Sequence, residues 1–356
     1  MKKILALSLF LAIAVFAVSC GSKKDAGDEI IIGSLQDITG PTSSLGKMVH
    51  EGALLAIEEI NAKGGISGKK IKLVSYDTKG DVNEAINAFT RAVTTGKASA
   101  IIGPPVANIA MAIAPISERY DVPVLGLAID PKCHIKEDGS PYKNMFGMQP
   151  NALQQGRIMA SYAMKNGFKR YGIIYNEANA YATSLLPSFI ETINKGSGKI
   201  LAQVPYNPND RDFKTLLNKI ISQNVDAIYA PGYTQDLILI AQQARAIGFK
   251  GALIFGLDAC PPFNTLMGEP CDNIYYINNV DDTEPQLQAM IKSVKEKKNI
   301  DVTNKFFLGY DTANIIAQLI SENGTDPKAL SAAVEKVTNY KGLTGIITID
   351  PKTHMP

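Results

Sequence analysis

Hydrophobic and polar residues follow two alternating periods along most of the chain. Continuous apolar runs at residues 29–36, 98–103 and 170–175 predict buried strands. Between such runs, apolar residues recur at helical spacing, as in residues 45–60 and 81–95, and these helices are expected to end at glycines. The regular alternation predicts an α/β protein whose parallel sheets carry helices on both faces.

The second half of the chain repeats the order of the first. Residues 98–108, ASAIIGPPVAN, correspond to residues 225–235, VDAIYAPGYTQ, and residues 122–130, VPVLGLAID, correspond to residues 251–259, GALIFGLDA. One such pair arises easily by chance, but two pairs in the same order favour a duplicated α/β lobe. The mature chain also exceeds the usual size of a single core, so we expect two doubly wound lobes with a cleft between them.

Five residues follow directly after predicted strands of these lobes. Ligands of open α/β sheets bind outside the carboxyl ends of the strands. The residues at those positions are Ala107 and Asn108, Asp130, Tyr233 and Asp258. The fold argument alone therefore places them at the cleft.

The N-terminus has the parts of an export signal, which we assign to residues 1–19. Lys2 and Lys3 precede an apolar run at 4–18 that is short for a bilayer span, which needs roughly 20 residues. The run ends at Cys20 in AVSC, which resembles a bacterial lipoprotein cleavage box, although Ala17 stands where that pattern prefers leucine. We expect lipidation of Cys20, with residues 20–29 as a tether. The alternative is an ordinary cleaved signal with a chance cysteine.

The charge of the chain limits which partners are expected, and its cysteines limit which disulfides can form. The chain has 36 basic and 34 acidic residues, so removing Lys2 and Lys3 leaves 34 of each. A balanced charge without a basic stripe argues against nucleic acid. In an exported protein Cys260 and Cys271 can form a disulfide with Cys133 left free, and three unpaired cysteines are an equal alternative.

The sequence carries no recognisable catalytic or metal-binding motif. His50, His134 and His354 lack metal-ligand spacing, and Cys133 beside His134 does not supply it. Residues 196–199, GSGK, lack the preceding glycine and the following Ser or Thr of a phosphate loop. We expect no enzyme activity, no cofactor and no metal. A hydrolase of small amides is a rival without an identifiable nucleophile.

Four long stretches are similar to periplasmic solute-binding proteins of the branched-chain amino acid (leucine/isoleucine/valine) type, which serve ABC importers. They lie at residues 30–81, 101–125, 226–251 and 310–320 and extend over nearly the whole mature chain. The resemblance implies a periplasmic-binding-protein type I fold with two lobes that close on a ligand. It also implies an extracytoplasmic location, ABC permease subunits as partners and a monomer.

The resemblance also implies a hinge of three crossovers, near residues 147–156, 275–282 and 340–350. The first lobe is then 28–149 plus 278–340, and the second is 150–277 plus 341–356. The family usually continues for another strand beyond the position of Pro356. Either this tail is short or the chain is truncated.

Family members that bind α-amino acids use a tyrosine and an acid of the second lobe for the ammonium group. Tyr233 and Asp258 match these positions, and Tyr181 matches an aromatic residue that faces the cleft. The serine and threonine that hold the ligand carboxylate in the first lobe are replaced here by Ala107, with Asn108 beside it, and by Asp130, in the same turn as Ala128. Leu45 replaces an aromatic residue that covers the ligand.

These exchanges change the expected ligand. The backbone N–H of Ala107, at a helix start, still suits a carboxylate. A second carboxylate at Asp130 would repel Asp258, which favours an amine- or amide-bearing solute over plain leucine. Alternatively, Asp130 caps a loop and points away, or the alignment is shifted by one residue. Rival functions are a ligand sensor of the same fold with a signalling receptor as partner, and a structural surface lipoprotein.

Overall fold

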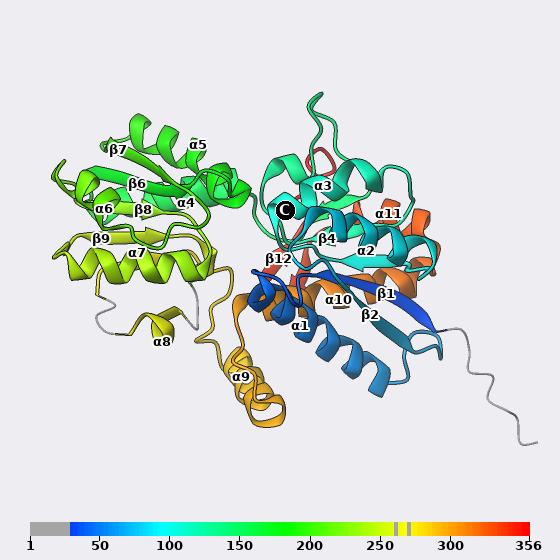
Figure 1. Ribbon diagram of the computed structural model, residues 1–356. Helices are drawn as coiled ribbons and strands as arrows, with labels where there is room; N and C mark the ends of the chain where they lie inside the picture. The colour runs from blue at the N-terminus through cyan, green and yellow to red at the C-terminus, as the bar shows by residue number, and fades with distance from the viewer. Residues whose placement is uncertain (1–28, 260–262, 269–271) are drawn as a thin grey trace, which may run out of the picture.

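The computed structural model describes residues 29–259, 263–268 and 272–356, which form two α/β lobes side by side (Figure 1). The first lobe is built on a parallel sheet of five strands in the order β2-β1-β3-β4-β5. Its strands are β1 (Ile30–Gln36), β2 (Ile71–Asp77), β3 (Ala100–Ile102), β4 (Val124–Gly126) and β5 (Met145–Gly147). Strands β3, β4 and β5 are completely buried, as their continuous apolar sequences predict.

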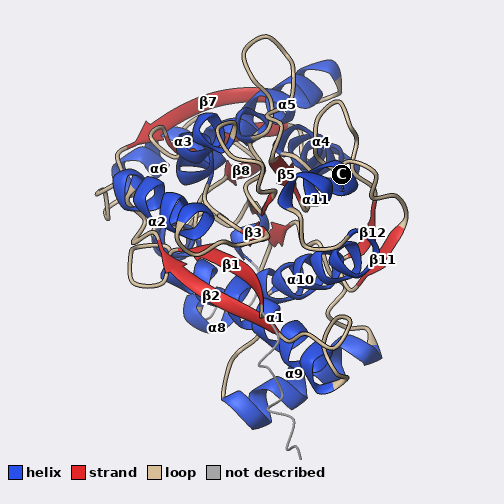
Figure 2. Ribbon diagram, turned by 90° about the vertical axis from the view of Figure 1, so that its right-hand side faces the viewer, coloured by secondary structure: helices blue, strands red, loops and turns tan. Residues whose placement is uncertain are grey.

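Helices cover both faces of this first sheet. They are α1 (Ser43–Ala62), α2 (Val82–Thr94), α3 (Ala107–Ser117), the 3-10 turn η1 (Pro131–Cys133), α10 (Asn304–Asn323) and α11 (Pro327–Val334). Helices α1 and α10 lie side by side and share a buried apolar cluster with β1 (Figure 2). Helix α2 begins where the sequence predicts, because the Asp81 side chain accepts a hydrogen bond from the Glu84 N–H at 2.9 Å.

The second lobe repeats the topology of the first. Its parallel sheet has the order β10-β9-β8-β6-β7, with β6 (Arg170–Asn176), β7 (Lys199–Tyr206), β8 (Ala227–Ala230), β9 (Ala252–Phe255) and β10 (Ile274–Tyr276). Its helical elements are α4 (Ala152–Lys165), α5 (Ala180–Lys195), α6 (Lys214–Ile221), α7 (Thr234–Ala246), η2 (Leu257–Ala259) and α8 (Phe263–Met267). Read from its β7 edge, the second sheet has β8 in third place and β9 in fourth, the places that β3 and β4 hold in the first sheet, which confirms the predicted internal repeat.

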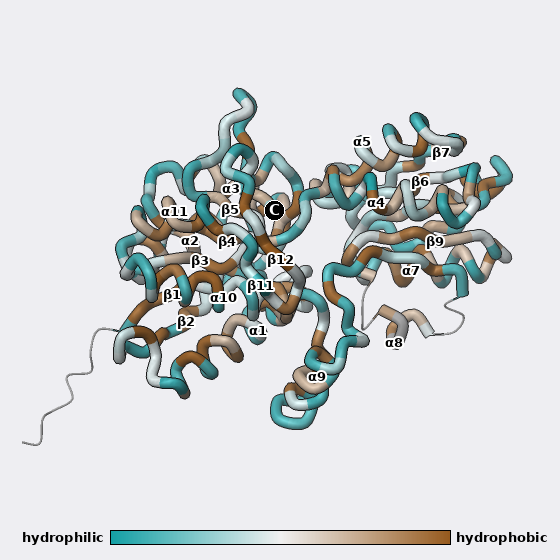
Figure 3. Tube along the Cα trace, turned by 180° about the vertical axis from the view of Figure 1, so that it is seen from behind, coloured by the Kyte–Doolittle hydropathy of each residue, from teal (hydrophilic) through white to brown (hydrophobic). Residues whose placement is uncertain are grey.

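Hydrophobic residues are concentrated along the sheet strands, where the trace is coloured brown (Figure 3). Strands β8 and β9 are buried at every position, since helices cover both of their faces. By contrast, α9 (Pro285–Lys298) buries only Leu287 and Val294 and projects from the molecule (Figure 1). Among the residues that the structure describes, no helix is both long enough and apolar enough to cross a bilayer.

The chain passes between the lobes at residues 148–151 and again after β10, close to two of the predicted crossovers. The hairpin of β11 (Tyr340–Gly342) and β12 (Gly345–Ile347) occupies the third predicted position. The tail beyond it, which we expected with the second lobe, lies instead on the first. Its His354 ring stacks on Phe146 with ring centroids 4.4 Å apart, and the Gly147 N–H donates to the His354 carbonyl at 2.8 Å.

Several predictions fall on residues outside the described ranges. These are the signal segment, the tether with Cys20, and the Cys260–Cys271 disulfide. Cys133 lies within the described part of the chain, where it is buried and unpaired.

Candidate ligand-binding cleft

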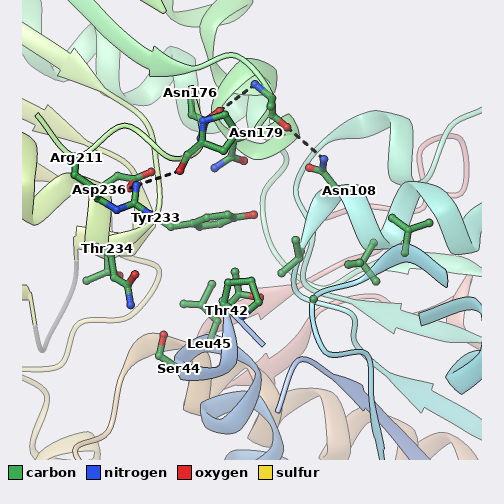
Figure 4. Close-up of a pocket in the computed structure, with 18 residues that line it drawn as sticks. Thr42, Ser44, Leu45, Asn108, Asn176, Asn179, Arg211, Tyr233, Thr234 and Asp236 are labelled. Atoms are coloured by element: carbon green, nitrogen blue, oxygen red, sulfur yellow. Dashed lines mark hydrogen bonds and ion pairs between the residues drawn. The ribbon is translucent and has the colours of Figure 1, made fainter. Parts of the chain in front are cut away.

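Two adjoining cavities lie between the lobes. The outer cavity has a volume of about 420 Å³ and is lined from the first lobe mainly by α1 and α3 and from the second lobe mainly by the loop before α5 and by α7 (Figure 4). The inner cavity has a volume of about 20 Å³, room for one water-sized group. Leu45 and Tyr233 line both cavities, so the two spaces form one cleft with a narrow inner end.

Two stacked tyrosines of the second lobe form one wall of the inner cavity. Tyr233 is the N-cap residue of α7, directly after β8, and Tyr181 lies in the first turn of α5. Their rings are nearly parallel, at 7°, with centroids 5.5 Å apart. The Tyr181 hydroxyl accepts a hydrogen bond from the Leu257 N–H at 3.2 Å. Burial, and then the nearby Asp258 carboxylate, raise the pKa of both phenols, so both remain protonated.

Asp258 lies opposite a buried lysine that the sequence analysis did not identify. Asp258 belongs to η2, after β9, and Lys305 lies in the first turn of α10, in the other lobe. The Lys305 Nζ is 3.3 Å from the Asp258 Oδ1, and the side chains are only 8% and 3% exposed. This oxygen has the lysine as an ionic neighbour but makes no geometrically acceptable hydrogen bond within the described residues. The two charges therefore neutralise each other at the inner end of the cleft.

Asp130 caps a turn beside the cleft. Its side chain accepts a hydrogen bond from the Lys132 N–H at 3.0 Å and so begins η1. Its neighbours Ala128 and Ile129 line the inner cavity, whereas Asp130 is absent from that lining. Burial raises the pKa of the Asp130 carboxyl. The geometry matches the alternative in which Asp130 caps a loop, and a contact of its carboxylate with a ligand stays a prediction.

Asn108 connects the two lobes directly. Its Nδ2 donates to the Ala178 carbonyl at 3.3 Å, and its Oδ1 accepts from the Ala180 N–H at 3.1 Å, both in the second lobe (Figure 4). The side chain lines the outer cavity. In this conformation the amide therefore joins the lobes at the rim of the cleft.

Ala107 and Leu45 complete the first-lobe wall. Ala107 is the first residue of α3, as expected, and lines the inner cavity with Pro105. The N-cap residue Val106 offers no side-chain hydrogen bond to the first turn of α3. Leu45, in the first turn of α1, reaches both cavities. Of the residues predicted from the sequence, Leu45, Ala107, Ala128, Tyr181, Tyr233 and Asp258 come together around the inner cavity.

The molecule has two similar lobes, each built on a parallel sheet, and a ligand-sized cleft at the carboxyl ends of their strands. This arrangement defines a two-lobed binding protein. The profile of the family described as "Periplasmic binding protein" matches residues 29–356. The chain belongs to this family. Its fold is the periplasmic-binding-protein type I fold, as the sequence predicted.

Relatives of known sequence or structure agree with this assignment. "Leu/Ile/Val-binding protein homolog 3" of Brucella melitensis biotype 1 is 27% identical over 333 residues, 92% of this chain and 87% of that protein. The crystal structure of a leucine-binding protein LivK from Thermotoga maritima superposes with a TM-score of 0.81 at 30% identity, covering 91% of this chain and 92% of that one. The substrate-binding protein LivJ of Streptococcus pneumoniae, in complex with isoleucine, gives 0.82 at 27% identity, covering 92% and 93%.

Replacing Asp130 with asparagine tests whether this carboxylate matters to the ligand. Asparagine keeps the acceptor for the Lys132 N–H and removes a charge that burial disfavours. Because the folded-state pKa of Asp130 is raised, the wild-type protein loses stability as pH rises from the ordinary aspartate pKa through that raised value. The variant should lack this loss and melt higher at pH 7, with its dissociation constant within about twofold of wild type. Thermal melts from pH 4 to 8 and a ligand titration measure both. A folded variant that binds much more weakly would place Asp130 at the ligand.

Proposed function

We propose that this protein is the extracytoplasmic substrate-binding lipoprotein of an ABC importer. It captures an amino acid or a related small polar solute between its lobes and presents the closed form to the permease. Cys20 is the lipidated residue that keeps the protein at the membrane. The observation that carries the proposal is an inner cavity built from both lobes in a member of the periplasmic binding protein family.

The contacts that cross the cleft support closure by a hinge. Lys305 meets Asp258, and Asn108 meets residues 178 and 180, so both lobes must approach for the inner cavity to exist. A ligand that contacts Ala107 on one side and Tyr233 on the other prefers this closed state. It therefore shifts the population toward it by its difference in affinity.

The names of the relatives support a small carboxylic acid as the solute. The LivJ protein of Streptococcus pneumoniae was crystallised with isoleucine. A solute-binding protein of R. palustris with the same fold was crystallised with benzoate, at 19% identity and a TM-score of 0.79, covering 92% of this chain and 90% of that one. The ring of Tyr233, stacked on Tyr181 with centroids 5.5 Å apart, also lines the outer cavity and suits an apolar or aromatic ligand body there.

A thermal-shift panel tests the proposal. The soluble form beginning at Gly21 is stripped of carried ligand by partial unfolding and refolding, then melted with amino acids, carboxylic acids, amides and small amines. The chain has no tryptophan, so circular dichroism or an external dye reports unfolding. A ligand at about 100 times its dissociation constant adds roughly 2.7 kcal/mol, a shift of several degrees. Stabilisation by none of these solutes would contradict capture of a small polar solute, and turnover of a bound one would revive the hydrolase alternative.

A further inference from the structure

We propose that Lys305 makes this cleft selective for carboxylic acids that lack an α-ammonium group. The inference rests on the proposed function, since it names the class of solute that the same cleft takes. Lys305 holds the place beside Asp258 that a ligand ammonium would otherwise fill.

The charges at the inner end of the cleft are already balanced. Among the described residues that line the inner cavity, Asp258 is the one acid and Lys305 the one base. The positive charge of Lys305 is costly, because the side chain is buried and lies in the first turn of α10, at the positive end of the helix dipole. The Asp258 carboxylate, 3.3 Å from the Lys305 Nζ, is the group that offsets this cost. A second ammonium at this carboxylate would meet the charge of Lys305 at close range.

Several hydrogen-bond acceptors around the inner cavity are already engaged, and the Asp258 Oδ1, which has no hydrogen-bond partner among the described residues, faces the Lys305 ammonium at 3.3 Å. An ammonium group brings three donors and no acceptor, so it needs several free oxygens. Side-chain donors already occupy four oxygens on the lining residues. These oxygens are the Leu127 carbonyl, with Gln149; the Ala128 carbonyl, with His134 at 3.1 Å; the Leu257 carbonyl, with Asn304 at 3.4 Å; and the Gln149 Oε1, with Asn279 at 3.3 Å.

Donors, in contrast, are free. The Tyr233 hydroxyl is buried without a hydrogen-bond partner among the described residues. It stays protonated, because burial and Asp258 raise its pKa. The first turn of α3, beginning at Ala107, receives no side-chain cap, so its N–H groups are available at the positive end of the helix. A phenol, uncapped N–H groups and the Lys305 ammonium together suit a carboxylate that brings acceptors alone.

The two cavities separate the head of the ligand from its body. The inner cavity, beside Tyr233 and Lys305, has room for a single small group of the ligand, such as one carboxylate oxygen. The outer cavity, lined in part by Pro41, Leu45 and Ile109, accepts a larger apolar body. We therefore infer a monocarboxylic acid with an aliphatic or aromatic body, such as a 2-oxo acid.

Matched pairs of ligands test the inference on the wild-type protein. Calorimetric titration of the stripped soluble form compares 4-methyl-2-oxopentanoate with leucine, and phenylpyruvate with phenylalanine. Each pair differs at the α-carbon alone. We expect the oxo acid to bind at least about tenfold more tightly in each pair, as one charge-assisted interaction contributes.

Replacing Lys305 with glutamine tests the residue itself. Glutamine can still donate to Asp258 but carries no charge. The oxo acids should lose about tenfold to a hundredfold in affinity while the amino acids lose much less, so that the ratio within each pair falls. A lysine with a purely structural role would weaken both members of a pair equally. Lys297, exposed on α9, gives the matched control, and its replacement by glutamine should leave every affinity unchanged.

The outcomes separate this inference from the proposed function. Tighter binding of leucine or phenylalanine than of their oxo analogues would overturn the role of Lys305 and leave an amino-acid importer standing. Binding of amines or amides alone would also overturn it. If K305Q does not fold, the double variant Asp258→Asn with Lys305→Met, which removes both charges, must still lose the preference for oxo acids. Binding of no solute of the wider panel would contradict both proposals.

Discussion

Replacing Lys305 with methionine is expected to lower the free energy of unfolding by about 3–5 kcal/mol. The partner carboxylate of Asp258 is 3% exposed and 3.3 Å from the Lys305 Nζ, so the variant leaves a buried charge without a counterion. Methionine keeps most of the volume of the lysine stem, and the loss therefore reports the charge rather than a cavity. Chemical denaturation followed by circular dichroism measures it.

Two further variants separate the ion pair from other effects. Replacing Asp258 with leucine in the Lys305→Met background removes both charges and should recover most of the lost stability. Lys195 pairs with Glu191 on the surface, with side chains 76% and 57% exposed, and its replacement by methionine should change stability by about 0.5 kcal/mol or less. Equal losses in the surface and buried variants would show that the buried pair carries no special weight.

Replacing Gly309 with alanine is expected to destabilise the protein by about 2–3 kcal/mol. Helix propensity alone predicts the opposite, since alanine is favoured over glycine in a helix interior by about 1 kcal/mol. Packing decides the sign. A Cβ at Gly309 would lie 2.1 Å from the Val49 carbonyl oxygen, and a Cβ at Gly52 would lie 1.9 Å from the Phe306 carbonyl oxygen. The two glycines allow α1 and α10 to approach along their backbones, and backbone atoms cannot move aside as a flexible side chain does.

Ser321 gives the control on the exposed side of α10. Its replacement by alanine meets no crowding and should leave stability unchanged or raise it by a few tenths of a kcal/mol. Thermal and chemical unfolding of both variants, measured side by side, distinguish packing from propensity. A Gly309→Ala protein as stable as wild type would mean that the helices are farther apart than the structure shows.

The sequence was enough to predict the fold and half of the cleft wall. Alternation of apolar runs with helical spacing predicted two parallel sheets, and the repeated segments at β3 and β8 predicted two equivalent lobes. Parallel strands bring their carboxyl ends to one edge, so Tyr233 and Asp258 could be placed at the cleft from their positions after β8 and β9. Their contact with a ligand stays a prediction.

Other features came only from the tertiary structure. Lys305 lies in an apolar helix far along the chain from Asp258, and no local pattern relates the two until the lobes pack. Asp130 and Asn108 come after strands, as expected. The side chain of Asp130, however, accepts a hydrogen bond from the Lys132 N–H, and the side chain of Asn108 reaches the opposite lobe. The tail packs on the first lobe through contacts between residues far apart along the chain, such as His354 and Phe146. Periodicity and strand order are local properties that a sequence displays directly, whereas side-chain direction and charge pairing depend on which distant surfaces meet.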